Sequence, residues 1–419
     1  MKNPPSIISR AKFDFINSSV IEKLESYNSK LSPELEAIPK LDPYSLNGQK
    51  LRLDFIRKQS NSNLDYLSGE KVFNDNESLK GNIENYIGMT QVPTGIIGPI
   101  VINGTHAQGG FYVPLATTEG TLLASYNRGA KACRESGAIT TITLQEGVQR
   151  TPTFKFKNLI DLGKFVTWVL DNKETFSALT RESSNYAILN DVGINIEGNI
   201  LILRFEYTSG DAAGQNMVTI CTDRICKYIL ENCPIKPVFW TIEGNTSGDK
   251  KATSLATRVR GKKITSEITL KRTAIESVLK TTPELLQQQW KISTSGAIKC
   301  GSNGTGMHPA NALAALFMAC GQDVACTGEA STALTRMEID ENGDLYCSIT
   351  MPNIIVGTVG GGTSFPTQKE CLQMIDCYGP GKSTKLAEIA INVCLAGEIS
   401  ILAAMSCGQF TAAHQKFGR

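Results

Sequence analysis

The sequence predicts a mixed α/β (α+β) protein in which a small sheet-and-helix unit is inserted into a larger domain. Between residues 151 and 239 the patterns follow the order strand, helix, strands, helix, strand, which is that of a ferredoxin-like unit. Long apolar helical stretches lie towards the C-terminus, above all at residues 383–404. With 419 residues, 41% of them hydrophobic, the chain can bury a large core and form more than one domain.

The first third of the chain mixes loop, helix and strand signals. Residues 1–48 have weak periodicity and predict an arm or one or two short helices. Residues 51–67 have apolar residues at helical spacing, whereas Pro and Gly recur at short intervals in residues 84–99 and predict an ordered loop. Residues 120–132 are rich in Leu, Ala, Arg and Lys and predict a helix, followed by a strand at residues 137–142.

The inserted unit is predicted from alternating strand and helix patterns. The helices are expected at residues 158–177 and 217–233, and the strands at residues 153–156, 186–190, 193–197, 199–208 and 236–242.

The remainder of the chain is predicted to be mostly helical. Helices are expected at residues 273–289, 311–321 and 383–404, and a strand pair at residues 334–339 and 345–351 is joined through the turn dipeptide Asn342-Gly343. The predicted organisation is therefore an N-terminal arm (1–48), a large domain (49–150 and 240–419) and a small domain (151–239).

Composition excludes several classes of protein. A net charge of +2 argues against nucleic acid as a partner. The 12 cysteines lie mostly in apolar stretches and form no Cys-x-x-Cys pair, which indicates free thiols in a reducing, cytoplasmic setting. Only three histidines occur, and none has metal-ligand spacing from a cysteine, so no metal site is expected. The N-terminus lacks a signal-peptide core, and the apolar stretch near residue 398 contains Glu398, so we expect a buried core helix and no membrane association.

Glu119 is a candidate general acid. It follows Thr117-Thr118 at the predicted start of the helix at residues 120–132, between small and apolar residues. A helix N-terminus favours the charged carboxylate, whereas apolar burial favours the neutral acid. Because glutamates in first helical turns commonly only cap, this stretch alone favours a capping role.

Glycine-rich stretches suggest a ligand that approaches the backbone closely. Residues 360–362 are three glycines, but no stretch fits the Rossmann fingerprint. Residues 379–383 (GPGKS) are not a phosphate-binding P-loop, because Asp376 occupies the position of the required upstream glycine.

Five segments and a lone histidine, His414, together form a family pattern. The segments are ENYIG (84–88), SGDAAGQNM (209–217), GNTSGDKKATSLATRVRGKK (244–263), GQD (321–323) and GTVGGGT (357–363). From about residue 51 to 419 the chain resembles 3-hydroxy-3-methylglutaryl-coenzyme A reductase, and its Asp-Lys-Lys loop is similar to class I of that family. The resemblance implies a four-electron reduction of the acyl-CoA to mevalonate and free CoA with two NADPH, on a non-Rossmann small domain.

The resemblance also implies roles for four residues. Lys250 would face the developing oxyanion, a strong way to stabilise that charge. Asp323, expected to be buried after an apolar helix, would pair with Lys250 and Glu119, and Glu119 would protonate the aldehyde oxygen. His414 would protonate the departing CoA thiolate, since histidine titrates in a suitable range.

Other matched positions imply binding roles. The family's cofactor motif is Asp-Ala-Met-Gly-Met-Asn. Residues 211–216 of this chain match it, with Ala213 and Gln215 in place of the two methionines. The implied cofactor residues are Asp211, Gly214, Asn216, Gly360, Gly361 and Arg419; NADPH is favoured, with NADH possible because Asn185 replaces an arginine. The implied acyl-site residues are Arg150, Asn245, Lys251, Lys291 and Asn311. The implied CoA-site residues are Glu84, Asn85, Ser125, Asn127, Arg128 and His308, of which His308 can equally be structural.

One substitution leaves the substrate open. Where the family has Ser-Gly-Asn, this chain has Glu243-Gly244-Asn245. A carboxylate there could repel the substrate's distal carboxylate, or it could pair with Arg150 or Lys251, or it could be protonated. Alternatives are therefore a reductase of another acyl thioester, on CoA or a carrier protein, and a non-catalytic paralogue. The resemblance further implies a homodimer or higher oligomer with a shared active site.

Overall fold

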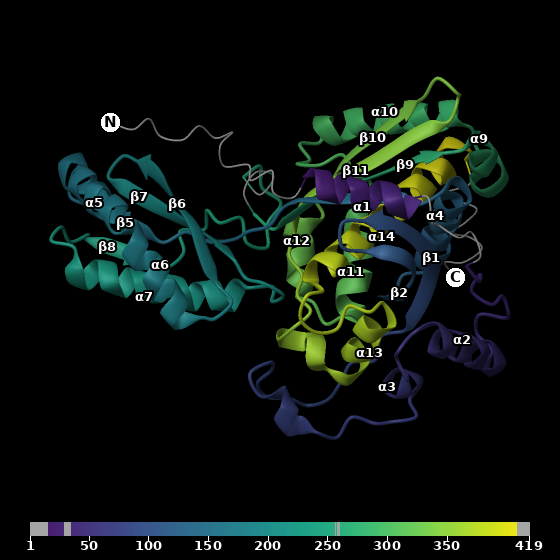
Figure 1. The fold of residues 1–419 in the computed structure, drawn as a ribbon, viewed down its shortest axis with the longest axis horizontal. Coiled ribbons are helices and arrows are strands. Elements are labelled where there is room, and N and C mark those ends of the chain that lie inside the picture. Colours follow the sequence, from purple (N-terminus) through teal and green to yellow (C-terminus); the bar gives the residue numbers. More distant parts are fainter. Residues whose placement is uncertain (1–15, 29–34, 256, 258–259, 409–419) are drawn as a thin grey trace.

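Two sheets with their own helices lie at opposite ends of the molecule (Figure 1). The structure, a computed structural model, describes residues 16–28, 35–255, 257 and 260–408. His414 and Arg419 lie outside the described residues.

The larger sheet has six strands in the order β10-β11-β9-β3-β1-β2. The pair β1–β3 is parallel and the other pairs are antiparallel. Its strands are β1 (Thr94–Gly104), β2 (Gln108–Ala116), β3 (Ile139–Gln145), β9 (Lys262–Leu270), β10 (Leu334–Ile339) and β11 (Leu345–Ile354). The predicted hairpin between β10 and β11 is confirmed, with Gly343 in the left-handed region at φ 78°.

The core of the large part is built around α14 (Ser383–Ser406), which contacts four strands of this sheet and the helix α4 (Leu122–Ser136). Helices α10 (Pro283–Lys299) and α11 (Pro309–Ala319) pack on it from other sides. Among the described residues α14 is the one helix long and apolar enough to cross a membrane, and 83% of its apolar window is buried inside the protein. The prediction of a buried core helix is thus confirmed.

The smaller sheet has the strand order β8-β5-β7-β6, with all pairs antiparallel, as the ferredoxin-like element order requires. An additional short strand, β4, pairs with the far end of β7. The strands are β4 (Val148–Arg150), β5 (Thr153–Lys155), β6 (Ile188–Glu197), β7 (Ile200–Thr208) and β8 (Phe239–Thr241), and the helices are α5 (Leu159–Asp171), α6 (Lys173–Ser183) and α7 (Gln215–Asn232). Strand β7 alternates half-buried and buried residues, so one face packs on the helices.

Several predicted boundaries are wrong for local reasons. The helix over residues 158–177 is two helices that meet at Asn172, and the strands at residues 186–190 and 193–197 are one strand with an irregularity after Leu189. The helix over 51–67 ends at Gln59 in α2 (Leu46–Gln59), followed by α3 (Asp65–Ser68). The helix over 273–289 is interrupted at Lys280, which has φ 60°, before Thr282 caps α10.

Other described elements complete the large part: α1 (Ser18–Asn28), η3 (Asn76–Leu79), α9 (Arg272–Ala274), the π-helical η4 (Ile275–Leu279), η5 (Val324–Cys326), α12 (Thr327–Ala330), η6 (Gly361–Ser364) and α13 (Pro366–Met374). The strands β1 and β9 were not predicted from sequence.

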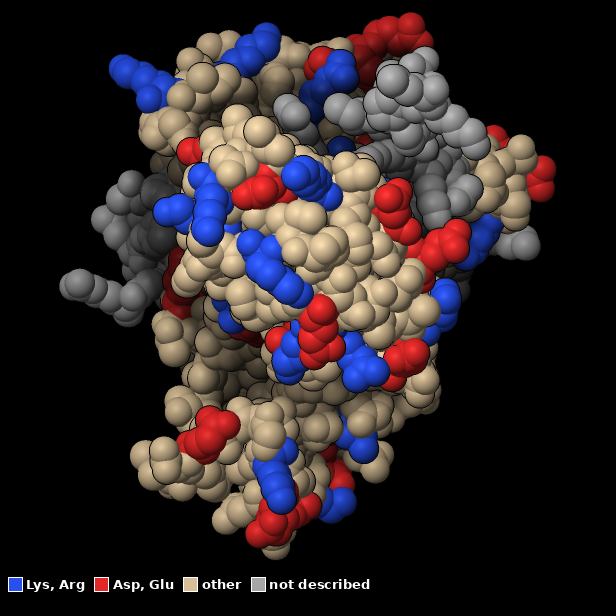
Figure 2. Space-filling model, turned by 90° about the vertical axis from the view of Figure 1, so that its left-hand side faces the viewer, with Lys and Arg blue, Asp and Glu red and all other residues tan. Residues whose placement is uncertain are grey.

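Cysteine and charge patterns agree with the sequence-based expectation. All 12 cysteines are free, and all except Cys300 and Cys407 are buried. Over the face that carries the small sheet, basic and acidic side chains lie intermixed, in keeping with the small net charge (Figure 2).

Candidate active site

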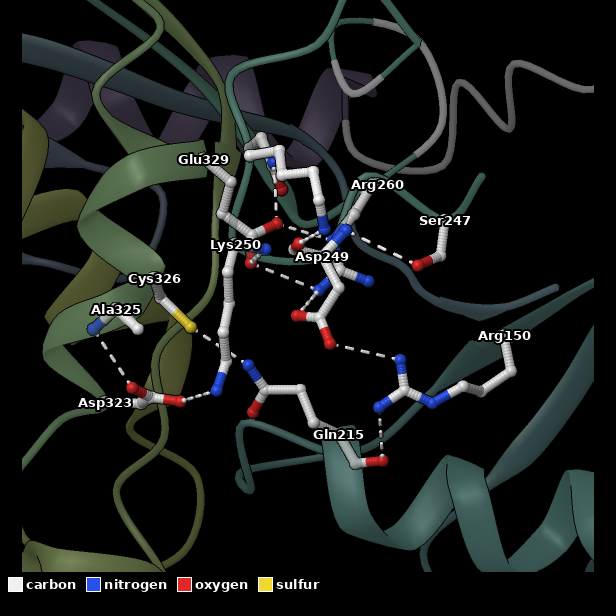
Figure 3. A network of polar contacts seen from close by, with 12 residues as sticks. Arg150, Gln215, Ser247, Asp249, Lys250, Arg260, Asp323, Ala325, Cys326 and Glu329 are labelled. Atoms are coloured by element: carbon white, nitrogen blue, oxygen red, sulfur yellow. Dashed lines mark hydrogen bonds and ion pairs between the residues drawn. The ribbon is translucent and has the colours of Figure 1, made fainter. Parts of the chain in front are cut away.

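Lys250 and Asp323 form an ion pair at the junction of the two parts (Figure 3). Lys250 lies on the loop between β8 and β9, and its Nζ is 3.0 Å from Oδ2 of Asp323. The other Asp323 oxygen accepts a hydrogen bond from the Ala325 amide at the start of η5. The hydrogen bond to Asp323 raises the pKa of Lys250, against the opposing effect of desolvation. The expectation that Asp323 is buried is wrong, since 40% of its side chain is exposed.

A buried charge network lies behind this pair. The Lys250 amide donates to Oε1 of Glu329 over 3.1 Å. Arg260 donates from Nε and Nη2 to the same carboxylate, and its Nη2 also reaches Oδ1 of Asp249 at 2.9 Å. The side chains of Arg260 and Glu329 are completely buried. Sequence reasoning missed Arg260 and Glu329; the available signal was an arginine in the Arg-Gly-Lys-Lys run and a glutamate six residues after Asp323.

Arg150 ties the small sheet to this network. It ends β4, and its Nη1 lies 3.2 Å from Oδ2 of Asp249. Its Nε donates to Oγ1 of Thr219 at 2.7 Å and its Nη2 to the Gln215 carbonyl at 3.2 Å, both on α7. The side chain of Arg150 is 10% exposed, so its charge is committed mainly to protein partners in this chain.

Glu243 turns towards the protein. Its carboxylate accepts hydrogen bonds from the hydroxyl and the amide of Thr151, and Oε2 lies 3.8 Å from Nη1 of Arg150. Of the alternatives left open by the sequence, the structure therefore supports pairing with Arg150.

Glu119 is placed differently from the sequence-based prediction. Helix α4 begins at Leu122, after Thr121 with φ 69°, so Glu119 precedes the helix and is exposed. Within the described residues its side chain pairs with Asn311, whose Nδ2 lies 3.4 Å from Oε1 of Glu119. The predicted helix start at residue 120 is two residues too early, so Glu119 is not in the first turn of α4.

The residues matched to the CoA site gather where α4 and α14 meet. Arg128 donates to Oγ and O of Ser400, at 3.0 and 2.6 Å, and burial lowers its pKa. Ser125 also bonds to Ser400, over 3.0 Å. His308 bonds through Nδ1 to Glu398 at 3.0 Å and stacks on Tyr126, which are structural contacts. Asn127 is on the same helix and accepts from the Gly98 amide, whereas Glu84 and Asn85 are on an exposed loop.

Three glycine-containing loops converge beside Asp323. The loop before α7 contacts the loop after β11, since the Thr358 amide donates to the Asp211 carbonyl at 2.8 Å. Gln322 exchanges two hydrogen bonds with Gly357, at 2.8 and 2.9 Å. Gly360 and Gly361 have positive φ, and a side chain added at either would meet nothing within 4 Å. This open backbone, together with the N-terminus of α7 at Gly214, fits an anionic ligand such as a dinucleotide.

Asp211 accepts hydrogen bonds from two backbone amides near the start of α14. Its Oδ2 accepts from the Gly381 amide at 2.6 Å and its Oδ1 from the Ser383 amide at 3.0 Å, at the start of α14. Burial by itself would raise the pKa of Asp211, but these amide donors bring it below the ordinary value. Asn216 is exposed in the first turn of α7.

The remaining basic and amide candidates are exposed. Lys251 donates to the Asp249 carbonyl at 3.0 Å, Asn245 has φ 62°, and Lys291 on α10 bonds Gln287 at 3.1 Å. Within the described ranges, His, Cys, Asp and Glu side chains form no group of three suited to a metal ion.

Comparison with known proteins identifies the family. The hydroxymethylglutaryl-coenzyme A reductase family profile matches residues 48–419. The chain is 37% identical to the 3-hydroxy-3-methylglutaryl-coenzyme A reductase of Methanocaldococcus jannaschii over 409 residues, covering 94% of this chain and 100% of that protein. The chain belongs to the hydroxymethylglutaryl-coenzyme A reductase family. A second reductase, from Pyrococcus abyssi, is 40% identical and covers 84% of this chain and 88% of that one.

The fold agrees with this family. The class II reductase of Streptococcus pneumoniae, whose structure is described as bound to NADPH in open conformations, matches with a TM-score of 0.69 at 15% identity, over 85% of this chain and 96% of that one. The chain is therefore an NAD(P)H-dependent oxidoreductase that reduces hydroxymethylglutaryl-CoA, and the class I-like resemblance read from the sequence is confirmed by its archaeal relatives. Among the functions left open by the sequence, these relatives support the reduction of hydroxymethylglutaryl-CoA.

Proposed function

We propose that this reductase converts hydroxymethylglutaryl-CoA to mevalonate with two NADPH at a site centred on Lys250. The observation that carries the proposal is the Lys250–Asp323 pair at the edge of the converging glycine loops. An ammonium ion fixed at such a point is suited to stabilise an oxyanion that develops on a carbonyl carbon under attack.

The steps can be assigned to residues of this chain. NADPH, when bound, supplies the two hydrides. Lys250 would hold the oxygen of the thioester carbonyl as it becomes negative, and it would hold the aldehyde oxygen in the second reduction. As the hemithioacetal collapses to the aldehyde, the C–S bond breaks and His414 would give a proton to the departing CoA sulfur. This proton favours departure because a thiol with a pKa of roughly 8.5 is mostly protonated near neutral pH. Glu119 would give a proton to the aldehyde oxygen.

Two features support NADPH as the cofactor, and only the second favours NADPH over NADH. Open backbone at Gly360 and Gly361 and the N-terminus of α7 suit the phosphates. Arg419 would supply a cation for the additional 2′-phosphate, since a guanidinium matches phosphate geometry. Asp211 would act in cofactor binding by fixing the loop between these elements. Comparison of kcat/KM for NADPH and NADH, with Arg419→Ala as the variant that narrows the ratio, tests this part.

We further propose a homodimer, or a higher oligomer built from it, whose active site is shared between subunits. Among the described residues Glu119 bonds to Asn311, whereas Lys250 pairs with Asp323. The loop that carries Glu84 and Asn85 exposes large apolar side chains, with Ile87 fully exposed, and such surface favours coverage by a protein partner.

A mixing experiment tests the shared site. Glu119→Gln and Lys250→Ala would each be inactive alone. If the two residues act from different subunits, mixed dimers regain one intact site, and random reassociation restores about a quarter of wild-type activity. Absence of recovery after confirmed subunit exchange, or an active monomer in sedimentation, would contradict the proposal.

We also propose domain limits and a cellular location for the enzyme. We assign residues 151–239 to a small cofactor domain, residues 49–150 with 240–419 to the catalytic domain, and residues 1–48 to an arm. Strands β4 and β8 extend the sheet of the small domain slightly beyond these limits. The buried free thiols suit a reducing compartment, so we place the enzyme in the cytoplasm.

The test of the proposed chemistry is Lys250→Ala. Oxidation of NADPH, followed by absorbance, is expected to fall by roughly 10² to 10³, the usual effect of removing one oxyanion donor. The matched control is Lys164→Ala, which removes an exposed lysine from α5 and leaves turnover unchanged. Turnover close to wild type in a folded Lys250→Ala enzyme would refute the assignment.

A further inference from the structure

One short segment holds Lys250 at three points. Asp323 contacts its ammonium group at 3.0 Å, and Glu329 accepts from its amide at 3.1 Å. Between them in sequence, Gly328 packs so closely that a Cβ placed there would lie 2.9 Å from the Lys250 carbonyl oxygen. The side chain, the amide and the carbonyl of Lys250 are therefore all constrained by residues 323–329.

Glu329 is itself held rigidly. It is fully buried, and its two oxygens accept from Arg260, from the Lys250 amide and from Nδ2 of Asn353 at 2.9 Å. A buried carboxylate is costly unless it is paired and hydrogen-bonded, and these donors meet that requirement. The arrangement gives Glu329 a single orientation towards the Lys250 amide.

The backbone of Lys250 needs such support. Its φ of 60° lies in the left-handed region, which residues other than glycine occupy at a cost. A lysine side chain has several rotatable bonds, so its ammonium position depends on where the backbone is fixed. Positioning errors of about 1 Å can reduce catalysis by about 10².

We propose that Glu329, oriented by Arg260, is a positioning residue that fixes the Lys250 peptide so that the ammonium group faces the reacting carbonyl. This inference rests on the proposed role of Lys250. Glu329 touches the backbone of Lys250, and it would act through Lys250 without touching substrate.

Two variants disturb the same peptide from different sides. Glu329→Gln keeps the size of the side chain but places an amide group among the donors of Arg260 and Asn353. Gly328→Ala leaves the buried ion pair intact and brings a methyl group against the Lys250 carbonyl. We expect kcat to fall by about 10² in each, with KM for both substrates within about twofold.

Glu388→Gln is the matched control. Glu388 is also fully buried and accepts from two backbone amides, those of His106 at 2.9 Å and Ala107 at 2.7 Å, on the β1–β2 turn. The Glu388→Gln substitution should lower the thermal midpoint as Glu329→Gln does, but kcat per folded enzyme should stay at the wild-type value. A purely structural role for Glu329 predicts the same behaviour in both variants.

The pH profile gives a second readout. If the Lys250 peptide moves, the contact with Asp323 loosens, and the alkaline limb of kcat shifts to lower pH in Glu329→Gln and Gly328→Ala but not in Glu388→Gln. Wild-type kcat and an unmoved limb in both folded site variants would overturn the inference. Such a result beside an inactive Lys250→Ala enzyme would leave the proposed function standing, whereas an active Lys250→Ala enzyme would remove the function itself.

Discussion

Replacement of Gly129 by alanine should separate the two helices at the centre of the large part. Gly129 is on α4, and a Cβ there would lie 1.8 Å from the carbonyl oxygen of Ala396 on α14. This is about half of the normal contact distance of roughly 3.5 Å. Because the obstacle is helix backbone, a rotamer change cannot relieve it. Overpacking typically costs about 1–3 kcal/mol, and we expect at least the upper end.

The same shift should affect substrate binding. Ser125 and Arg128 lie on the same turns of α4 and bond to Ser400 on α14, so separation of the helices breaks these contacts. We expect a thermal midpoint lower by about 3 °C or more, and a raised KM for the acyl-CoA at temperatures where the enzyme remains folded.

Gly163→Ala is the control for this prediction. Gly163 is also helical, on α5, but nothing lies within 4 Å of the position of its added Cβ. This change should stabilise the protein by about 0.5–1 kcal/mol, because alanine has the higher helix propensity. Equal midpoints for the Gly129 and Gly163 variants in differential scanning fluorimetry would refute the reasoning from helix contact.

Three further predictions concern single carboxylates. Asp323→Asn removes the hydrogen bond that raises the pKa of Lys250, so the alkaline limb of kcat should move to lower pH; an unchanged limb in pH–rate measurements would be inconsistent with the pair. Asp211→Ala removes the acceptor at the start of α14 and should cost about 1 kcal/mol in urea unfolding at neutral pH. Because the pKa of Asp211 is lowered in the folded state, this difference should be present above the ordinary carboxyl pKa and vanish as the pH falls through the folded value; a difference that persists in acid would contradict it. Glu243→Ser should change KM for hydroxymethylglutaryl-CoA by less than about threefold, since Glu243 is bonded to Thr151, and a tenfold fall in KM, about 1.4 kcal/mol, would restore the repulsion hypothesis.

Local patterns predicted the elements that depend on local physics. The β10–β11 hairpin follows from Asn342-Gly343, and the buried α14 follows from its composition. The helix breaks at Asn172 and Lys280 were not predicted, because apolar residues continue at helical spacing across both positions. Strand β1 was missed because its Gly and Pro residues have the composition of a loop, while β2 and β3 supply its hydrogen bonds.

The residues of the candidate site likewise fall into those that the sequence indicated and those that only the structure shows. The resemblance to the family implied a pairing of Lys250 with Asp323, and the structure brings the two side chains together. Arg260 and Glu329 were missed even though both lie close in sequence to these motifs, because a buried ion pair between residues far apart in sequence depends on tertiary structure. Glu119 was placed wrongly because the turn at Thr121 delays the start of α4, which a composition favourable to helix cannot reveal.

The charge network has a consequence for how the two parts of the enzyme are held together. Asp249 lies between Arg260 of the large part and Arg150 at the end of β4, with contacts of 2.9 and 3.2 Å. Arg150 in turn holds the first turn of α7, next to the loop of Asp211. Lys250 directly follows Asp249 in sequence. The Asp249 carboxylate therefore links the position of the Lys250 ammonium group to the position of the loop that contains Asp211. Rotation of the small sheet relative to the large one would therefore have to break contacts of partly buried charges, which favours a fixed distance between the Asp211 loop and Lys250.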